Sequence, residues 1–344
     1  MAYIAINFDH YRHNLNLLAS KAGRIEKLMA VLKDNAYGHG LLEMAPLAAA
    51  VGVKWAAVKN KQEASVVEPF FENVLILVDR PSQEVNDKWV FAVHSLESIA
   101  KMPKGTRIHL KVDTGMHRNG VLLREIEEAC ALIDEKKLRL EGAMMHHSSA
   151  DMVGTTYFVQ KENFETAKGI LRECALRYGF SELKFHSCNS AALLRHEGVF
   201  EEDFARVGIA SYGYTDLPEV FGSYNLKPVM SLWAKKISTR ALEKGDCVGY
   251  GGVFEAPTPM VVSTYDIGYG DGFFRYDGKS DLCISDGRPI LGRISMDSFS
   301  LEGDDDEVCV FSDACPIARH FHTISYEIIT KLATWLSKKV ITSH

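Results

Sequence analysis

The chain has 344 residues, of which 47% are hydrophobic and 24% charged. This length allows two domains, or one barrel with an appendage, and the composition is that of an ordinary folded protein, which excludes collagen, coiled coil and wholesale disorder. The 39 basic and 45 acidic residues give a net charge of -6. That sign argues against a general affinity for nucleic acid or for anionic membrane surfaces.

The seven cysteines predict a cytoplasmic protein with reduced thiols. Their number is odd, their spacing is wide and no CxxC pair occurs, which argues against a disulfide framework and against a structural metal site. The N-terminal residues lack the basic and apolar regions of a signal peptide. The most apolar stretch, 44–53, is too short to span a bilayer.

The first two thirds of the chain alternate between short β-branched runs and longer amphipathic segments. The predicted strands cover residues 28–33, 54–58, 73–78, 90–95, 107–113, 140–147, 184–190 and 205–213. Helical spacing between them is clearest over 123–137 and 159–179. Apolar strands that alternate with amphipathic helices predict a parallel sheet covered by helices, and eight such units predict a TIM-type (β/α)₈ barrel.

The pattern changes after about residue 222. Strand-like runs separated by Gly and Asp turns follow, and long helical patterns are absent until about residue 322. We therefore expect an α/β chain with a barrel over 9–222 and a smaller, mostly β domain over 223–344. The first strand, predicted within 3–9, fits either body, and we assign residues 1–8 to the β domain.

Candidate site residues follow from the barrel, because catalytic groups of such folds sit at the C-terminal ends of the strands. Those positions hold Lys33, the segment 111–118, His146, Asn189–Ser190 and Arg206–Ile209. The set is rich in cations and hydrogen-bonding groups and poor in carboxylates. It predicts an anionic, phosphorylated ligand, with a phosphate cup at the last two strands.

Lys33 ends an apolar strand in the segment VLKDNAYGHG. A lysine withdrawn from water at such a position can act as a nucleophile. A lysine that extends its amine into solvent is the plainer alternative. The segment itself closely resembles the pyridoxal-phosphate lysine segment of alanine racemases.

Further segments resemble the same family in the same order. They are KVDTGMHRNG (111–120), EGAMMHHSSAD (141–151), HSCNSAA (186–192), RVGIASYG (206–213), VGYGGVFEA (248–256), IGYGDGFFR (267–275) and GRISMDSF (292–299). The resemblance runs from about residue 3 to 330. It implies a barrel followed by a β domain, pyridoxal 5'-phosphate as cofactor, and the interconversion of L-alanine and D-alanine by an isomerase that supplies D-alanine for peptidoglycan.

The resemblance also assigns roles to residues. Racemisation needs acid/base groups on both faces of the substrate. Lys33 would hold the cofactor as an imine (the internal aldimine) and serve one face, and Tyr250 would serve the other from the neighbouring subunit. Each site is therefore expected to need a homodimer.

Other matched residues would bind the cofactor or the substrate. His146 would lie along the cofactor ring, and Arg206 would face its pyridine nitrogen. The phosphate would be held by Tyr37, Asn189, Ser190, Gly208 and Ile209. Arg118 would orient the cofactor's phenolic oxygen and the substrate carboxylate, Met296 and Tyr269 would close the partner's entrance, and Lys111 would be carbamylated.

The chain also departs from the family pattern. MHRNG (116–120) replaces the commoner MGRLG, and Val207 stands where a proline is usual. The family's C-terminal tyrosine, which touches the phosphate, is missing from the stretch 332–344, where Thr334 or Trp335 takes its place.

Three alternatives stay open at this point. A racemase of the same fold that accepts serine, lysine or arginine would carry the same segments. A non-catalytic pyridoxal-phosphate carrier would have the barrel alone, and the extra β domain argues against it. A barrel decarboxylase would need an acidic partner for the ring nitrogen, where this chain has Arg206.

Overall fold

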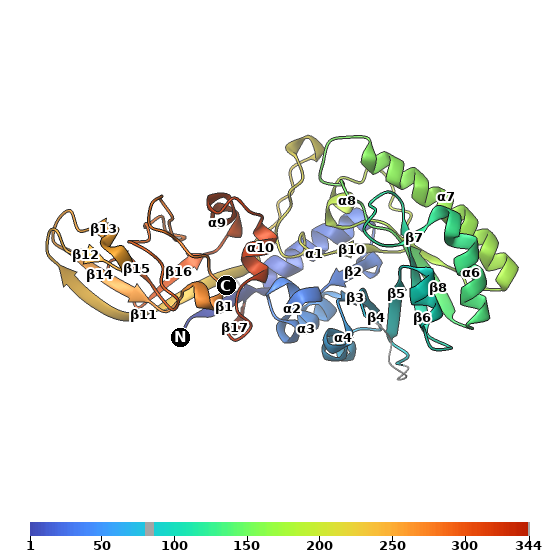
Figure 1. Ribbon diagram of the computed structural model, residues 1–344, viewed down its shortest axis with the longest axis horizontal. Coiled ribbons are helices and arrows are strands. Elements are labelled where there is room, and N and C mark those ends of the chain that lie inside the picture. The colour runs from blue at the N-terminus through green and yellow to red at the C-terminus, as the bar shows by residue number, and fades with distance from the viewer. Residues whose placement is uncertain (80–85, 343–344) are drawn as a thin grey trace. The chain divides into compact units, whose positions relative to one another are not determined.

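The computed structural model describes residues 1–79 and 86–342 (Figure 1). The chain forms two compact units, and each collects segments that are separate in the sequence. The first unit consists of Met1–Tyr11, Asn35–Glu43 and Pro228–His344, and the second of Arg12–Asp34 and Met44–Lys227.

The second unit is built on eight parallel strands. In sheet order they are β10 (Ala205–Val207), β2 (Leu28–Val31), β3 (Trp55–Val58), β4 (Asn73–Ile76), β5 (Trp89–Val93), β6 (Arg107–Asp113), β8 (Arg139–Met144) and β9 (Lys184–His186). The short β7 (Val121–Leu122) adds to β6. Backbone hydrogen bonds also join the two ends of this order, because the amides of Asp203 and Arg206 donate to Phe185 O and Cys188 O at 3.1 and 2.9 Å. The predicted (β/α)₈ barrel is confirmed.

Helices follow most of the barrel strands, as the alternation in the sequence predicts. They are α1 (Phe8–Ala22), α2 (Lys33–Tyr37), α3 (Leu41–Val51), α4 (Lys61–Val67), α5 (Leu96–Ala100), α6 (Ile126–Glu135), α7 (Thr156–Tyr178) and α8 (Ser190–Leu194). Helices α6 and α7 lie side by side and correspond to the segments predicted over 123–137 and 159–179 (Figure 1). None of the described helices combines the length and the apolarity needed to cross a membrane.

Polar side chains of β6 recur at every second position, Arg107, His109 and Lys111. Because strand side chains alternate between the two faces, these three share one face of the barrel wall. Arg107 pairs with Glu141 of β8 at 2.8 Å, and the His109 ring stacks on Trp55 of β3 at 5.7 Å. Both partners come from other strands, so this face lines the barrel interior, with Lys111 nearest the C-terminal end.

The first unit is mostly antiparallel β structure. Its main sheet has the order β15 (Phe299–Glu302), β14 (Met260–Tyr265), β11 (Met230–Leu242), β1 (Tyr3–Asn7) and β17 (Ser337–Ile341), with β16 (Glu307–Phe311) also paired to β11. A hairpin joins β12 (Cys247–Val248) to β13 (Phe254–Glu255). Two short helices follow the strands, α9 (Ala314–His320) and α10 (Ser325–Thr330), and the seven-residue α9 is not one of the long helical patterns expected only from about residue 322. The start of α9 has an N-cap, because Asp313 accepts from Cys315 N.

A fully buried asparagine fastens α1 to the end of the barrel unit. The Asn14 amide donates to Ser211 O and Lys227 O at 3.1 and 2.8 Å, and its Oδ1 accepts from Lys227 N at 2.8 Å.

We expect Asn14→Ala to lower the free energy of unfolding by about 2 kcal/mol, because it leaves buried backbone groups unpaired. Urea unfolding measures this. Asn16→Ala, at an exposed position of the same helix, is the matched control, and equal losses in the two variants would contradict the prediction.

Candidate functional site

Lys33 opens a strained turn rather than ending a strand. Strand β2 stops at Val31, and Lys33 begins α2, whose next four residues have φ between 52 and 55°. Four consecutive non-glycine residues in the left-handed region are costly, because Cβ crowds the carbonyl oxygen. Strained backbone of this kind is common at functional sites, where the surrounding structure holds it in place. The Asp34–Asn35 pair, which tolerates this region, was the signal in the sequence.

Lys111 is buried in the barrel, next to other cations. Its Nζ donates to Asn119 Oδ1. The pKa of Lys111 is lowered to about 8, first by burial and then by the charges of Arg118 and Arg206. Three cationic side chains predicted for the site are therefore close enough to act on one another.

The turn between β6 and Arg118 is fixed by a carboxylate. Asp113 Oδ1 accepts from the amides of Gly115, Met116 and His117 at 2.9 to 3.1 Å. These bonds stabilise the charged form, so the pKa of Asp113 stays below its usual value even though burial opposes the shift. Arg118 is exposed at the end of this turn, where its guanidinium is available to a ligand.

His146 lies just beyond the end of β8 and is partly buried. Burial lowers its pKa to about 2, and Arg206 and Arg118 act in the same direction, so the imidazole is neutral at physiological pH. Gln160 of α7 is buried and fixes this loop, with its amide donating to His146 O at 3.3 Å and accepting from Ser148 N at 2.8 Å. The neighbouring His147 is buried against Tyr157, with ring centroids 4.6 Å apart, which is a structural role.

Arg206 is buried at the end of the barrel and donates to several acceptors. Its Nη1 bonds His186 O and His186 Nδ1 at 2.6 and 2.8 Å, and its Nη2 bonds Met145 O and Ser187 O at 2.6 and 3.1 Å. Burial lowers the pKa of Arg206 to about 10, which leaves the guanidinium protonated at neutral pH. Its position is thus set by strands β8, β9 and β10 together.

The predicted phosphate cup is a compact turn at the ends of β9 and β10. Ser190 Oγ accepts from Gly208 N and Ala210 N at 3.0 and 3.3 Å, so backbone amides and a hydroxyl converge. Asn189 Oδ1 accepts from Ala192 N at 2.9 Å and caps α8. Its oxygen is occupied by this cap, whereas Ser190 keeps a hydroxyl proton to donate.

Ile209 is buried in the second unit, and its carbonyl oxygen accepts from Tyr212 N and Tyr214 N at 3.1 and 3.2 Å. The other predicted residues belong to the first unit. Tyr250 stands in the 3₁₀ turn η5 (Tyr250–Gly252) and is 70% exposed, and Met296 is 55% exposed. Tyr269 opens η6 (Tyr269–Asp271), whose backbone is bound to the Met296 turn, because Gly270 N donates to Met296 O at 2.8 Å. A Cβ at Gly268 would collide with that same carbonyl.

Tyr37 also lies in the first unit. Its ring centroid is 6.1 Å from that of Tyr326 in α10. Trp335, one candidate for the place of the family's C-terminal tyrosine, is 72% exposed, and its Nε1 donates to Asp271 Oδ1 at 3.4 Å. That contact ties the C-terminal segment to the turn that carries Tyr269.

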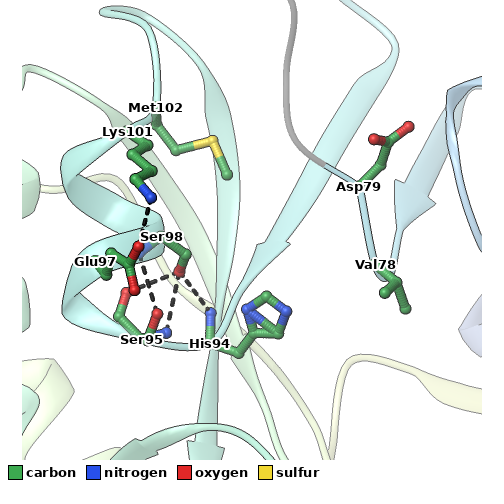
Figure 2. Close-up of a pocket in the computed structure, with 8 residues that line it drawn as sticks. All are labelled: Val78, Asp79, His94, Ser95, Glu97, Ser98, Lys101 and Met102. Carbon is green, nitrogen blue, oxygen red and sulfur yellow. Dashed lines mark hydrogen bonds and ion pairs between the residues drawn. The ribbon is translucent and has the colours of Figure 1, made fainter.

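A separate hollow of about 280 Å³ lies between the ends of β4 and β5 (Figure 2). It is lined by Val78 and Asp79 on one side and by His94, Ser95 and residues of α5 on the other. Burial lowers the pKa of His94, and Lys111 adds to the shift. None of the residues predicted for the site lines this hollow. In residues 1–79 and 86–342, no group of three or more His, Cys, Asp and Glu side chains is placed to hold a metal ion.

These observations define a class of protein. A parallel barrel carries a lysine on a strained turn, a set of cations and a turn of convergent amides, and a β domain follows it in the chain. This is the arrangement of a barrel enzyme for a small anionic ligand. Family models for the alanine racemase N-terminal and C-terminal domains match residues 6–216 and 229–340. The chain belongs to the alanine racemase family.

Curated relatives agree over nearly the whole chain. Alanine racemase of Campylobacter jejuni subsp. jejuni serotype O:23/36 (strain 81-176) is 46% identical over 332 residues, which is 96% of this chain and 97% of the relative. Alanine racemase of a Nitratiruptor species is 46% identical over 338 residues, or 98% and 99% of the two chains. Homologues with this name are isomerases.

Solved structures show the same fold. Alanine racemase of Clostridium difficile 630 superposes with a TM-score of 0.88 at 26% identity, covering 99% of this chain and 96% of that one. The Bacillus anthracis alanine racemase, solved with bound L-Ala-P, has a TM-score of 0.83 at 27% identity, with 99% and 95% covered.

The lowered pKa of Lys111 predicts a pH-dependent stability. Below pH 8 the amine is protonated in both states, so the folded protein bears the full cost of a buried charge, at most about 3 kcal/mol. Between pH 8 and 10.5 the unfolded state binds more protons, so this cost is relieved as pH rises. In buffers freed of carbon dioxide, where Lys111 keeps its free amine, Lys111→Met should therefore be stabilising, most strongly below pH 8 and less so toward pH 10.5.

Urea midpoints of the wild type and the variant, measured from pH 7 to 10.5, give this difference directly. Lys104→Met, at an exposed position, is the control for general effects of alkaline pH. A stability gain that does not change with pH would contradict a charged lysine at position 111.

Proposed function

We propose that the protein is an alanine racemase that interconverts L-alanine and D-alanine with pyridoxal 5'-phosphate. The observation that carries the proposal is Lys33, placed on a strained turn just beyond a barrel strand and close enough to Lys111 for their charges to interact, in a chain 46% identical to curated alanine racemases. The L-Ala-P bound to the Bacillus anthracis relative supports a small amino-acid substrate.

The residues present fit the cofactor. A phosphate group matches the turn where the amides of Gly208 and Ala210 converge on the Ser190 hydroxyl, since amides and hydroxyls donate to anions. Tyr37 and Ile209 complete the proposed phosphate site. The cations around Lys111 would otherwise repel one another, and an anionic ligand offsets that repulsion.

When bound, pyridoxal phosphate stabilises negative charge at the substrate's α-carbon. Lys33 supplies the amine that anchors the cofactor and exchanges the α-proton on one face. Arg206 would face the ring nitrogen, and because a guanidinium only donates, that nitrogen would accept a hydrogen bond rather than carry its own proton. This arrangement would weaken the withdrawal of negative charge into the ring and favour return of the proton over side reactions. The neutral His146 would lie along the ring.

Tyr250 exchanges the proton on the opposite face. It belongs to the first unit and is exposed, as are Tyr269 and Met296. The exposure of these three large side chains supports the proposal that they enter the active site of a second copy of the chain. We therefore propose a homodimer with shared active sites.

Arg118 is proposed to bind the substrate carboxylate, for which a planar guanidinium is suited. Lys111 lies behind it, and we retain carbamylation of this residue as a proposal. Carbon dioxide reacts only with a neutral amine, and the lowered pKa of Lys111 raises the neutral fraction. The carbamate would place a negative charge beside Arg118.

In the cell, the proposed role is the supply of D-alanine for peptidoglycan. All seven cysteines are free, which supports a cytoplasmic location. A racemase with broader substrate range is the second candidate, because the residues named above contact the cofactor and the carboxylate rather than the substrate side chain.

Proton exchange in deuterated water tests the proposal. The protein with added pyridoxal phosphate is given L-alanine, and parallel samples receive L-serine, L-lysine and L-arginine. NMR measures α-deuteration, and chiral chromatography measures the D-enantiomer. We expect α-deuteration of alanine with formation of D-alanine, and faster turnover of alanine than of the other three amino acids. Lys33→Ala should lower the rate by several orders of magnitude, because it removes both the anchor and one proton-exchanging group.

Tyr250→Phe separates the two faces. This variant should still bind the cofactor and exchange the α-proton of one enantiomer while forming almost none of the other. Cofactor binding without any exchange by the wild type would favour a carrier and overturn the proposal. Comparable rates for alanine and lysine would favour the broader racemase.

A further inference from the structure

Three nitrogen-bearing side chains, Arg206, His186 and His109, form a hydrogen-bonded series in the barrel interior. The proposed chemistry gives a role to Arg206 and none to the two histidines. Arg206 Nη1 lies 2.8 Å from His186 Nδ1, and His186 Nε2 lies 2.8 Å from His109 Nδ1. Both histidines are fully buried. The three residues come from β10, β9 and β6, so the series crosses the barrel from its C-terminal end inward.

Elementary chemistry determines which nitrogen carries each proton in this series. A guanidinium only donates, so His186 Nδ1 must be unprotonated and accept. A neutral His186 then carries its proton on Nε2 and donates it to His109 Nδ1. His109 in turn carries its proton on Nε2. Each histidine has one permitted tautomer, and the order of donation runs from Arg206 to His186 to His109.

The surroundings hold both rings neutral. Burial lowers the pKa of His109 to about 3 and that of His186 well below its usual value. The cations Arg107, Lys184 and Arg206 lower the pKa of His109 further, and Arg206 does the same for His186.

His109 is also held in place mechanically. Its ring stacks on Trp55 of β3, with ring centroids 5.7 Å apart. On β8, a Cβ at Gly142 would stand 2.4 Å from Lys184 O and 3.0 Å from His109 Nε2, so a glycine at this register position leaves room for the neighbouring strand and for the ring. The Nε2 atom has no hydrogen-bond partner within the described part of the chain. An unpaired buried donor is costly, and the bond that His109 Nδ1 forms with His186 is the ring's one hydrogen bond among the described residues.

We propose that His109 is a positioning residue for Arg206. By accepting a hydrogen bond from His186 Nε2, His109 keeps the lone pair of His186 Nδ1 facing the guanidinium. In the opposite tautomer an N–H would face another N–H, and Arg206 would lose one acceptor and be pushed away from it. The proposal rests on the proposed function only for its catalytic consequence, because the order of protons is a property of the protein alone.

NMR of protein labelled with ¹⁵N at histidine tests the order of protons. Two-bond ¹H–¹⁵N correlations distinguish the tautomers, and loss of signals in His109→Asn and His186→Asn assigns them. We expect both rings to be neutral with protons on Nε2 from pH 6 to 9, with and without pyridoxal phosphate. A proton on Nδ1 of either ring, or a charged ring, would overturn the proposal whether or not the protein racemises alanine.

A pair of variants tests the consequence for Arg206. Asparagine can offer an oxygen near the place of Nδ1, whereas leucine cannot. We expect His109→Leu to lower kcat for alanine about tenfold, the value of one lost hydrogen bond, with KM nearly unchanged, and His109→Asn to recover most of that loss. The absorption spectrum of bound cofactor should shift in His109→Leu alone.

Equal losses in the two variants, or a change in KM without a change in kcat, would show that His109 serves only packing. If His109→Leu does not fold, the tautomer measurement on the wild type still decides the proposal. If the wild type fails to racemise alanine but shows the expected tautomers, the proposed function fails and the positioning of Arg206 by His109 stands.

Discussion

A buried guanidinium that can only donate hydrogen bonds is the constraint on which the barrel end depends. Arg206 is enclosed by β8, β9 and β10, and acceptors must reach it from each side. Carbonyl oxygens of Met145, His186 and Ser187 supply most of them, and the His186 ring supplies one more. Because leaving a buried charge unpaired costs several kcal/mol, about 3 to 5, the ends of these strands are fixed in register around one side chain. The amide of Arg206 itself bonds Cys188 O and helps to close the barrel.

The second constraint is the positive charge at the same end of the barrel. The charges of Arg118, Arg206 and Lys33 all lower the pKa of Lys111, whereas the Asp113 carboxylate raises it. An anion would stabilise such a cluster, and the proposed phosphorylated cofactor and carboxylate substrate would provide one. The left-handed turn after Lys33 adds backbone strain at the same place. Burial, charge and strain thus coincide at the residues for which the proposed chemistry needs them.

The sequence predicts the barrel well and the ends of its strands less well. Eight apolar runs with intervening helical spacing suffice for the fold, because the hydrophobic period is a local property. The runs 140–147, 184–190 and 205–213 are predicted too long, since the observed strands end at Met144, His186 and Val207 and the chain turns aside to present polar groups. The left-handed turn and the His109–His186 contact escape prediction for a different reason. The turn is signalled only by the Asp34–Asn35 pair. The His109–His186 contact depends on neighbours that only the closed barrel brings together, although His109 stands at the strand position alternate to Lys111.

Heterodimers test the central claim, that Lys33 and Tyr250 of two different subunits form one racemase site. Lys33→Ala and Tyr250→Phe chains with different tags are co-expressed, and the mixed dimer is purified through both tags. Each parent homodimer should be nearly inactive, whereas the mixed dimer holds one intact site and should show about half of the wild-type activity per dimer. A mixed dimer no more active than its parents would contradict the account.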